Sequence, residues 1–313
     1  MLISMRSRCI AFAVLTLLLA GPSLAAPPGT GFVHVATAQN TQGDITQLDH
    51  LLLNDQPGAV PLVTHNWNPG GPALGVDNHS DVRVFYDALE GRWTLANEDG
   101  TDIAVGAAFN VFVPSEEADA FVHTTTEESI TGNWSTIEHP ATDDAPDAIV
   151  FASHAGITDH PHPLGVWYTG DARWAVFNED EEVDMPADLS FHVFVGPDDP
   201  DVFVHTAEED TITGHTTTID HPRVNDDPNA ILLVTQSWNP GGGAGIYNES
   251  SVAVYYVPGP GRWRIFNQLG APMPVGTSFH VAVVPEPEAA LGQGAALALL
   301  GLVWRRWRAR VRS

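Results

Sequence analysis

The sequence contains a single cysteine and no lysine. Its one cysteine, Cys9, precedes the apolar run of the N-terminal segment, so the rest of the chain can form neither disulfides nor thiol sites. Such a chain must be stabilised by core burial, which modules of roughly 85 residues can achieve. All 13 basic residues are arginine, against 39 acidic residues. Between Ala26 and Val284, 6 arginines face 37 acids, and this negative charge argues against nucleic acid as a partner.

The motifs of familiar catalytic sites are also missing. The sequence has no G-x-S-x-G nucleophile elbow, no H-E-x-x-H zinc motif and no cysteine nucleophile. Between the two ends of the chain, no stretch shows the 3.6-residue periodicity of an amphipathic helix. We therefore expect a non-enzymatic protein, and an unrecognised hydrolase is a remote alternative.

The N-terminus has the pattern of a secretory signal peptide. Two arginines precede an apolar run from Ile10 to Gly21, and Ser23-Leu24-Ala25 supplies small residues at the −3 and −1 positions. We predict cleavage after Ala25, which makes residues 1–25 the signal peptide. An uncleaved membrane anchor is the alternative, but the run is short for a span of roughly 20 residues.

Three copies of one module follow. Each copy begins with the tripeptide FVH, and a second histidine preceded by an acid comes 16 residues after the first. Strand-like segments then recur at matched offsets, including an RW…N segment in every copy. Matched offsets in three copies indicate duplication of one module. We assign the modules to residues 32–113, 121–195 and 203–284.

Each module is expected to be all-β. Six short segments per copy, such as AILLV, VAVYY and RWRIFN, are rich in valine, isoleucine, threonine and aromatic residues, with turn residues between them. This pattern predicts three tandem antiparallel β modules, either small sandwiches or partly open barrels. The short acidic linkers PSEEADA and GPDDPDV predict that the modules lie as beads along the chain. One closed assembly, such as a propeller, is the alternative.

The repeated histidines are one candidate site. Two imidazoles at a fixed spacing, with an acid beside the second, could bind a metal ion. The alternative is structural: the first histidine would bond a neighbouring turn and the second would end a strand. We favour the structural interpretation, because a third ligand is not evident. The candidate metal ligands are His34, His50, His123, His139, His205 and His221.

The WNPGG loops are a second candidate site, formed by Trp67 and Asn68 in copy 1 and by Trp238 and Asn239 in copy 3. A tryptophan beside amides and a Gly-Gly turn could stack on a sugar ring and bond its hydroxyls. In the alternative, which we favour, the tryptophan packs at the core and the asparagine caps the turn. Copy 2 has HAGITDHPHP here and is shorter, as loops rich in Pro and Gly permit.

Two further patterns are interpreted more simply. Trp93, Trp174 and Trp263 alternate with apolar residues, so we expect them in the core, with the preceding arginine paired to an acid. The stretches TDDAPDA and NDDPNA offer carboxylate oxygens to calcium, but they lack the spaced ligands of a dedicated calcium loop. We expect no cofactor beyond weak calcium binding.

The C-terminal segment, residues 285–313, begins inside Val284-Pro285-Glu286-Pro287 and continues with an apolar run from Ala289 to Trp304. That run is marginal for a bilayer of roughly 30 Å, and the arginines after it would place the C-terminus in the cytoplasm. A plain C-terminal membrane helix is therefore one interpretation. The basic cluster begins with Arg305, Arg306 and Arg308.

The order of these parts closely resembles the PEP-CTERM sorting signal of Gram-negative bacteria, from which only the polar spacer EAALGQG departs. The resemblance implies that the tail holds an exported protein at the inner membrane. An exosortase-type enzyme would then cut near Pro-Glu-Pro and pass the protein to the cell surface or to extracellular polysaccharide.

The three modules are similar to a tandem repeat of uncharacterised function found in secreted bacterial proteins, a resemblance that adds no site residues. We therefore predict an exported protein of the cell surface or matrix, whose repeated modules act as a structural or interaction unit. Repetition suits multivalent binding, because it raises avidity. The alternative is a secreted carbohydrate- or metal-binding protein that uses the WNPGG loops or the histidines.

Overall fold

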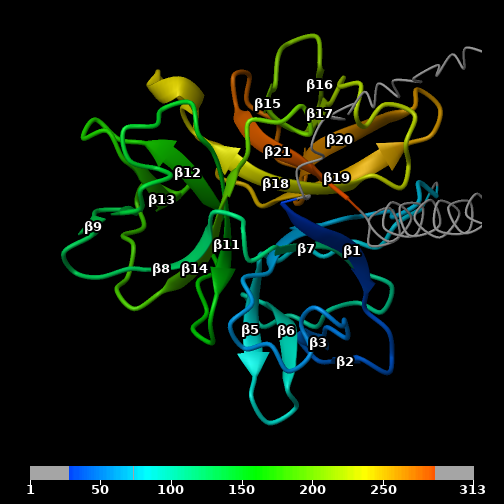
Figure 1. The fold of residues 1–313 in the computed structure, drawn as a ribbon. Helices are drawn as coiled ribbons and strands as arrows, with labels where there is room; N and C mark the ends of the chain where they lie inside the picture. The colour runs from blue at the N-terminus through cyan, green and yellow to red at the C-terminus, as the bar shows by residue number, and fades with distance from the viewer. Residues whose placement is uncertain (1–27, 73, 286–313) are drawn as a thin grey trace, which may run out of the picture.

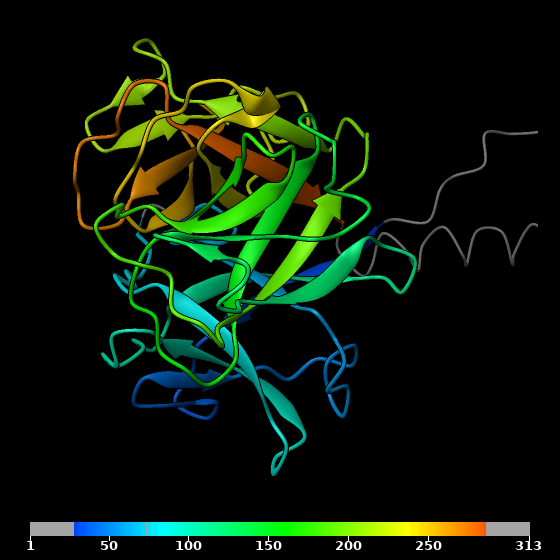
Figure 2. The same ribbon diagram turned by 90° about the vertical axis from the view of Figure 1, so that its left-hand side faces the viewer.

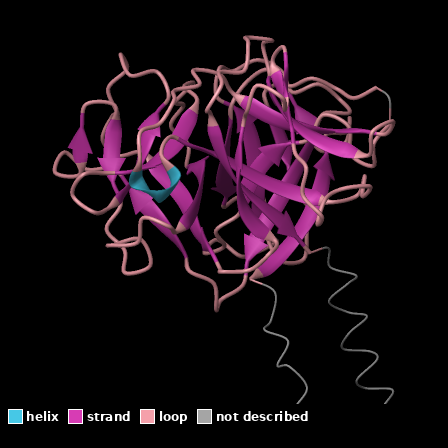
Figure 3. Ribbon diagram, turned by 90° about the horizontal axis from the view of Figure 1, so that it is seen from above, coloured by secondary structure: helices cyan, strands magenta, loops and turns pink. Residues whose placement is uncertain are grey.

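The computed structural model describes residues 28–72 and 74–285, and nearly all their regular structure is β-strand (Figure 3). Module 1 contains β1 (Gly29–Val35), β2 (Thr41–Gln42), β3 (Ile45–Gln47), β4 (Leu62–His65), β5 (Val82–Asp87), β6 (Arg92–Asn97) and β7 (Ala108–Pro114). Module 2 contains β8 (Ala120–Thr124), β9 (Ile130–Thr131), β10 (Trp134–Thr136), β11 (Ile149–Ala155), β12 (Leu164–Tyr168), β13 (Trp174–Asn178) and β14 (Ser190–Gly196). Module 3 contains β15 (Val202–Thr206), β16 (Ile212–Thr213), β17 (Thr216–Thr218), β18 (Ile231–Ser237), the 3-10 turn η1 (Pro240–Gly242), β19 (Val252–Val257), β20 (Arg262–Asn267) and β21 (Ser278–Val284).

The all-β prediction is confirmed, with one strand more per module than the sequence indicated. The six predicted strands are present in each copy, and the extra ones are the two-residue strands β2, β9 and β16. Within the described ranges, no helix is long and apolar enough to cross a membrane. The predicted signal peptide and the apolar C-terminal run lie outside the described residues.

Each module folds its strands into two antiparallel sheets around its own core. In module 1 the order is β1-β7-β4 in one sheet and β2-β3-β6-β5 in the other, and modules 2 and 3 repeat it. The tryptophan that begins each RW…N segment is buried in this core, as predicted, and its indole N–H donates to a backbone carbonyl. These core tryptophans are Trp93, Trp174 and Trp263.

The modules do not lie as beads, because the four-stranded sheet of each one continues into the three-stranded sheet of another. β5 of module 1 pairs with β11 of module 2, and β12 of module 2 pairs with β18 of module 3, both in parallel. Asn66, just after β4, forms the equivalent parallel bridge to Val254 of β19. The three modules therefore close into a ring (Figure 1), whose interfaces we call boundaries 1/2, 2/3 and 3/1. The expectation of beads is therefore wrong, and the alternative of one closed assembly is correct, although the ring is not a propeller.

A fourth apolar core, shared by all three modules, explains why the ring closes. It contains Leu62, Phe151 and Leu233, which occupy the same position in the three copies, and Phe112 and Phe194. These side chains lie on the face of each three-stranded sheet that points away from the module's own core. An isolated module would expose this face to water, and apolar surface of that kind is buried whenever a partner surface is available.

Three hydroxyl groups link the modules in a cycle around the centre of the ring. Each accepts a hydrogen bond from a backbone N–H of another module, at N···O distances of 2.9 to 3.2 Å. The three bonds run from Val63 N–H to Ser153 Oγ, from Ala152 N–H to Thr235 Oγ1 and from Val234 N–H to Thr64 Oγ1. Figure 2 shows the same ring turned by 90°.

The two ends of the described body lie side by side. The N–H of Gly31 in β1 donates to the carbonyl oxygen of Pro285, at 2.9 Å. A Cβ atom at Gly31 would come within 2.7 Å of Val284, so only glycine permits this approach. The chain therefore enters and leaves the ring at the same place.

Replacing Thr64 with valine should lower the free energy of unfolding by about 1–3 kcal/mol, because the N–H of buried Val234 would lose its acceptor. Thr64→Ser is the matched control: it keeps the oxygen, as copy 2 does naturally at Ser153. Denaturant unfolding followed by tryptophan fluorescence measures both. Equal stability of the two variants would contradict the role given to the hydroxyl cycle.

Candidate functional site

A polar cavity of about 90 Å³ lies where the three modules meet. Its wall includes the three hydroxyls of the cycle and, from the next position along each strand, His65, His154 and Gln236. The cavity therefore sits on the approximate threefold axis of the ring. The cavity has room for several water molecules, because one water molecule needs roughly 10–15 Å³.

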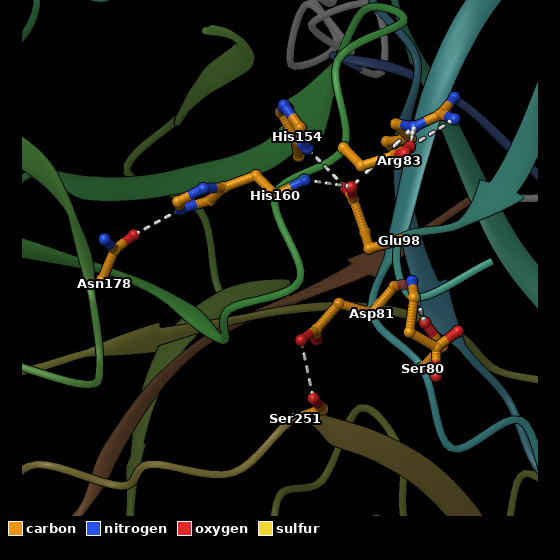
Figure 4. Close-up of polar contacts among 10 residues, drawn as sticks. Ser80, Asp81, Arg83, Glu98, His154, His160, Asn178 and Ser251 are labelled. Carbon is orange, nitrogen blue, oxygen red and sulfur yellow. Dashed lines mark hydrogen bonds and ion pairs between the residues drawn. The ribbon is translucent and has the colours of Figure 1, made fainter. Parts of the chain in front are cut away.

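Titratable groups gather at boundary 1/2, some on the cavity wall and some beside it (Figure 4). Glu98, just after β6, accepts hydrogen bonds from Nδ1 of His154 and, at 2.8 Å, from the backbone N–H of His160. Arg83 of β5 lies 3.8 Å from Glu98 and forms a 2.7 Å ion pair with Asp159. A carboxylate of module 1 thus connects two segments of module 2.

Asp81 and His160 are two further titratable residues on the cavity wall. The Ser251 hydroxyl of module 3 donates to Oδ2 of Asp81 at 2.7 Å. Burial, together with the nearby Glu98 and Asp99, raises the pKa of Asp81 to about 6, although the hydrogen bond from Ser251 acts in the opposite direction. Burial lowers the pKa of His160 to about 4, while its Nε2 is hydrogen-bonded to the Asn178 side chain at 2.6 Å.

Largely uncharged groups occupy the same positions at the other two boundaries. At boundary 3/1, Nδ1 of His65 is hydrogen-bonded to Oε1 of Gln268 at 3.0 Å. At boundary 2/3, Glu179 accepts from the backbone N–H of Asn248 at 3.0 Å, and burial raises its pKa to about 8, so the carboxyl is mostly neutral at pH 7. The repetition of these contacts indicates that they join modules.

The pair of His154 and Glu98 is the arrangement in this cavity closest to catalytic chemistry. An imidazole held by a carboxylate can exchange a proton with a bound molecule. Nε2 of His154 is buried and has no hydrogen-bond partner in the part of the chain that the structure describes. A serine or threonine activated by this histidine, as nucleophilic catalysis requires, is therefore not present in the described geometry.

The WNPGG loops hold the ring together. Asn68 makes two hydrogen bonds of 2.8 Å with the backbone N–H and carbonyl of Tyr256, and Asn239 makes the same pair of bonds with Tyr168. We call each pair an asparagine latch. The latches close boundaries 3/1 and 2/3, while Trp67 and Trp238 are half-buried beside them. Copy 2 has Ile157 at this position, 80% exposed, so boundary 1/2 has no latch.

Each candidate metal ligand has a structural partner. The histidine of each FVH segment bonds a hydroxyl through Nε2, at distances of 2.8 to 2.9 Å, and the second histidine stacks on the phenylalanine of that segment. The first group contains His34, His123 and His205, bonded to Thr46, Ser135 and Thr217; the second contains His50, His139 and His221, stacked on Phe32, Phe121 and Phe203. Among the described residues, no group of three or more His, Cys, Asp or Glu is arranged to hold a metal ion.

The remaining candidates also have defined places. The arginine of each RW…N segment pairs with the acid before the second histidine, as at Arg262 and Asp220, 3.4 Å apart. In the Asp-rich stretch of copy 2, Asp143 pairs with Arg173 at 3.1 Å. Of the sorting motif, only Val284 and Pro285 are described. The other sorting residues, Glu286, Pro287, Arg305, Arg306 and Arg308, lie outside the described residues.

Two sets of residues that join modules were missed from the sequence. The first is the Glu or Gln that directly follows the RW…N asparagine: Glu98, Glu179 and Gln268. The second is the polar residue after the first phenylalanine of the last strand, which bonds a backbone carbonyl of another module: Asn110, His192 and His280, at 2.7 to 2.9 Å. Their repetition at one offset was the available signal. Burial lowers the pKa of both these histidines to about 4.

Replacing both His192 and His280 with asparagine should make the ring less sensitive to acid. Their folded pKa lies below the ordinary value of 6.5, so their contribution to stability is present above pH 6.5 and is lost as the pH falls toward 4. The wild type should lose roughly 2 kcal/mol per histidine between pH 7 and 4.5. Asparagine keeps the hydrogen bond, as Asn110 does in copy 1.

Denaturant unfolding of both proteins across this pH range measures the difference. The variant should show the flatter pH dependence, whatever its stability at pH 7. The same loss of stability in both proteins would show that other groups cause the acid sensitivity.

Comparison with known proteins places the repeat in a family. The sequence matches the family described as "Domain of unknown function (DUF7452)" three times, over residues 23–90, 83–195 and 165–283. No curated protein and no solved structure matches the chain. The matches together cover far more than half of the sequence, and they confirm the resemblance to a tandem repeat of uncharacterised function. The chain belongs to the DUF7452 family and contains three tandem copies of its domain.

Proposed function

We propose that the chain works outside the cell as a non-enzymatic scaffold of the cell surface or extracellular matrix. The closed ring is the observation that carries this proposal. Its central polar groups bond one another across the module boundaries. The WNPGG loops join modules, and the repeated histidines bond or stack within their own modules. A rigid body of repeated modules, built from core burial without disulfides, suits a structural or interaction role.

The two ends of the chain support the proposed location. The N-terminal pattern is that of a signal peptide, and the C-terminal order of Pro-Glu-Pro, apolar run and arginines resembles a sorting signal. Because Gly31 bonds Pro285, a protein held by its C-terminal segment would carry its attachment point on one side and present the rest of the ring outward. An exosortase-type enzyme would be its processing partner, with transient anchoring in the inner membrane.

The charge of the body suits a hydrated matrix. Among the described residues, five arginines form ion pairs with acids, namely Arg83, Arg92, Arg173, Arg223 and Arg262. The acids far outnumber them, so most carboxylates on the surface lack a basic partner. Such a surface stays soluble and repels phosphate polymers, and weak calcium binding through its carboxylates would be compatible with it.

Cell fractionation and intact mass spectrometry test the proposed processing. We expect mature protein at the surface or in the matrix, starting at Ala26 and lacking the arginine-rich C-terminus. Changing Glu286 and Pro287 together to alanine should keep the uncut protein in the membrane fraction, whereas Glu116→Ala plus Glu117→Ala in the linker after module 1 should not. Mature surface protein that still ends at Ser313 would contradict processing, and protein confined to the cytoplasm would contradict export.

A second candidate function is binding of extracellular polysaccharide at boundary 2/3. Four aromatic side chains, none of them fully buried, contact one another there, with ring centroids 5.2 to 5.9 Å apart: Trp134, Trp167, Trp238 and Tyr247. The equivalent positions at boundary 3/1 hold Thr216, Tyr255, Trp67 and Asp77, and those at boundary 1/2 hold Ile45, Phe85, Gly156 and Asp159. Only this boundary concentrates rings that have both an apolar face and a polar atom, a common composition of binding surfaces.

Affinity electrophoresis in gels containing xylan, dextran or alginate tests this second function. Trp134→Ala and Trp167→Ala should each reduce retardation by one of these polysaccharides at least tenfold, because each removes a contact ring. Tyr255→Ala at boundary 3/1 is the matched control, since it occupies the position of Trp167 in another module, and should bind as the wild type does. Unchanged retardation of the two tryptophan variants would exclude this surface.

A further inference from the structure

Among the described residues, Arg264 of module 3 has no acidic partner, although acids far outnumber arginines in the body. The other five arginines between Ala26 and Val284 all form ion pairs. Nη1 of Arg264 donates a hydrogen bond to the Tyr255 hydroxyl at 3.2 Å, but its buried Nε has no partner within the described ranges. A buried N–H group without an acceptor costs free energy, so this one needs an explanation.

Arg264 lies on the outer face of the four-stranded sheet of module 3. It follows the core residue Trp263 in β20, so its side chain points to the opposite face of the sheet. On the neighbouring strands it is paired with Thr218 of β17 and Tyr255 of β19. Trp67 of module 1 contacts Tyr255 edge to face, with ring centroids 5.9 Å apart. Two aromatic side chains and one cation, all half-buried, therefore meet at boundary 3/1.

We call these three residues, Trp67, Tyr255 and Arg264, the Arg264 site. The fold holds it in place, because the backbone N–H of Trp67 donates to the carbonyl of Val254 at 2.9 Å beside the asparagine latch. The fold does not require the arginine, since Thr94 and Ala175 occupy its position in the other two modules. An arginine that the sheet can do without, and that has no internal acid to pair with, is available to a ligand.

The chemistry of the site selects a carboxylate attached to a sugar. A guanidinium group is a planar fork that binds carboxylates through two parallel hydrogen bonds, and Nε and Nη2 lie on one edge of that fork. Half-buried tryptophan and tyrosine side chains offer flat apolar surface and polar atoms to a ligand. The acids of the body, including Asp77 at this boundary, repel chains of many negative charges. The site therefore suits one isolated carboxylate.

We propose that the Arg264 site binds a single uronic acid residue of an otherwise neutral glycan, with the carboxylate on Arg264 and the sugar packed against Trp67 and Tyr255. The choice of a sugar over a peptide rests on the proposed location outside the cell. The site is separate from the aromatic side chains at boundary 2/3. A neutral polymer has no carboxylate for it and a polyuronate is repelled, so Tyr255→Ala remains a valid control for binding of such polymers at boundary 2/3.

NMR titration of the full chain tests the site without any substitution. The side-chain N–H resonances of Arg264 and Trp67 should both shift when methyl β-D-glucuronide is added. Methyl β-D-glucoside should bind at least about tenfold more weakly, because it lacks the charged group that pairs with the arginine. Equal affinity for the two sugars would overturn the proposal.

Two further probes test the sugar part of the assignment. Acetate carries the carboxylate alone, and N-acetylaspartate amide carries it on a peptide unit, so both should bind more weakly than the glucuronide. Acetate that binds as tightly as the glucuronide would show that the aromatic side chains contribute nothing, and would overturn recognition of a sugar. Tighter binding of the aspartate compound would assign the site to an acidic peptide instead. Because all probes are added to purified protein, these outcomes do not depend on whether the protein is exported.

Two variants separate the local contact from the general effect of charge. Arg264→Thr introduces the residue that copy 1 has at this position, and it should weaken glucuronide binding at least about tenfold while leaving the glucoside unchanged. Arg223→Thr is the matched control, because it removes an arginine of module 3 that is already paired with Asp201, and it should bind as the wild type does. Equal losses in both variants would overturn the role of Arg264. If Arg264→Thr does not fold, the comparison of sugars on the wild type still decides.

Discussion

The apolar second face of the three-stranded sheets is the constraint on which the rest of the structure depends. A sheet in a small sandwich needs only one buried face, yet Phe112, Phe151 and Phe194 point away from their own module cores and are fully buried between modules. Because linkers of a few residues keep consecutive modules close, the second faces can bury only against one another. Three of them meet around an axis, and the closed ring follows from burial before any polar contact is considered.

Polar groups then fix how the modules meet, and here the copies have diverged. Every copy supplies a hydroxyl to the cycle, and a residue without a side-chain acceptor would leave a buried backbone N–H without this partner. At positions farther from the hydroxyl cycle, the three copies have different types of residue. The residue that bonds across the boundary is Asn110 in copy 1 and a histidine in copies 2 and 3. The loops after β4 and β18 each provide an asparagine latch, whereas the loop after β11 provides Asp159, which forms an ion pair with Arg83. Duplication thus supplied three equal interfaces, of which one became charged.

The sequence predicted six of the seven strands in each module and the core tryptophans, because alternation and matched offsets are local properties. It did not predict the ring. The strands FNVFV and FHVFV each contain a polar residue, Asn110 or His192, within an apolar pattern, and nothing in that pattern indicates a second buried face. Those polar residues are buried as well, bonded to carbonyls of other modules. Likewise, the partners of Asn68 and Asn239 lie in another module, and no spacing within one copy reveals them.

The differences between the three boundaries indicate which part of the surface can recognise another molecule. In a ring whose central groups are mostly bonded to one another, the inside is committed to holding the modules together, and recognition is left to the outer surface. That surface differs at each boundary: aromatic rings gather at 2/3, charges at 1/2, and a latch with fewer rings lies at 3/1. Three identical sites would have raised avidity for one ligand, but the copies instead became unlike where they meet. The chain is therefore better understood as one body with three distinct junctions than as a trivalent binder.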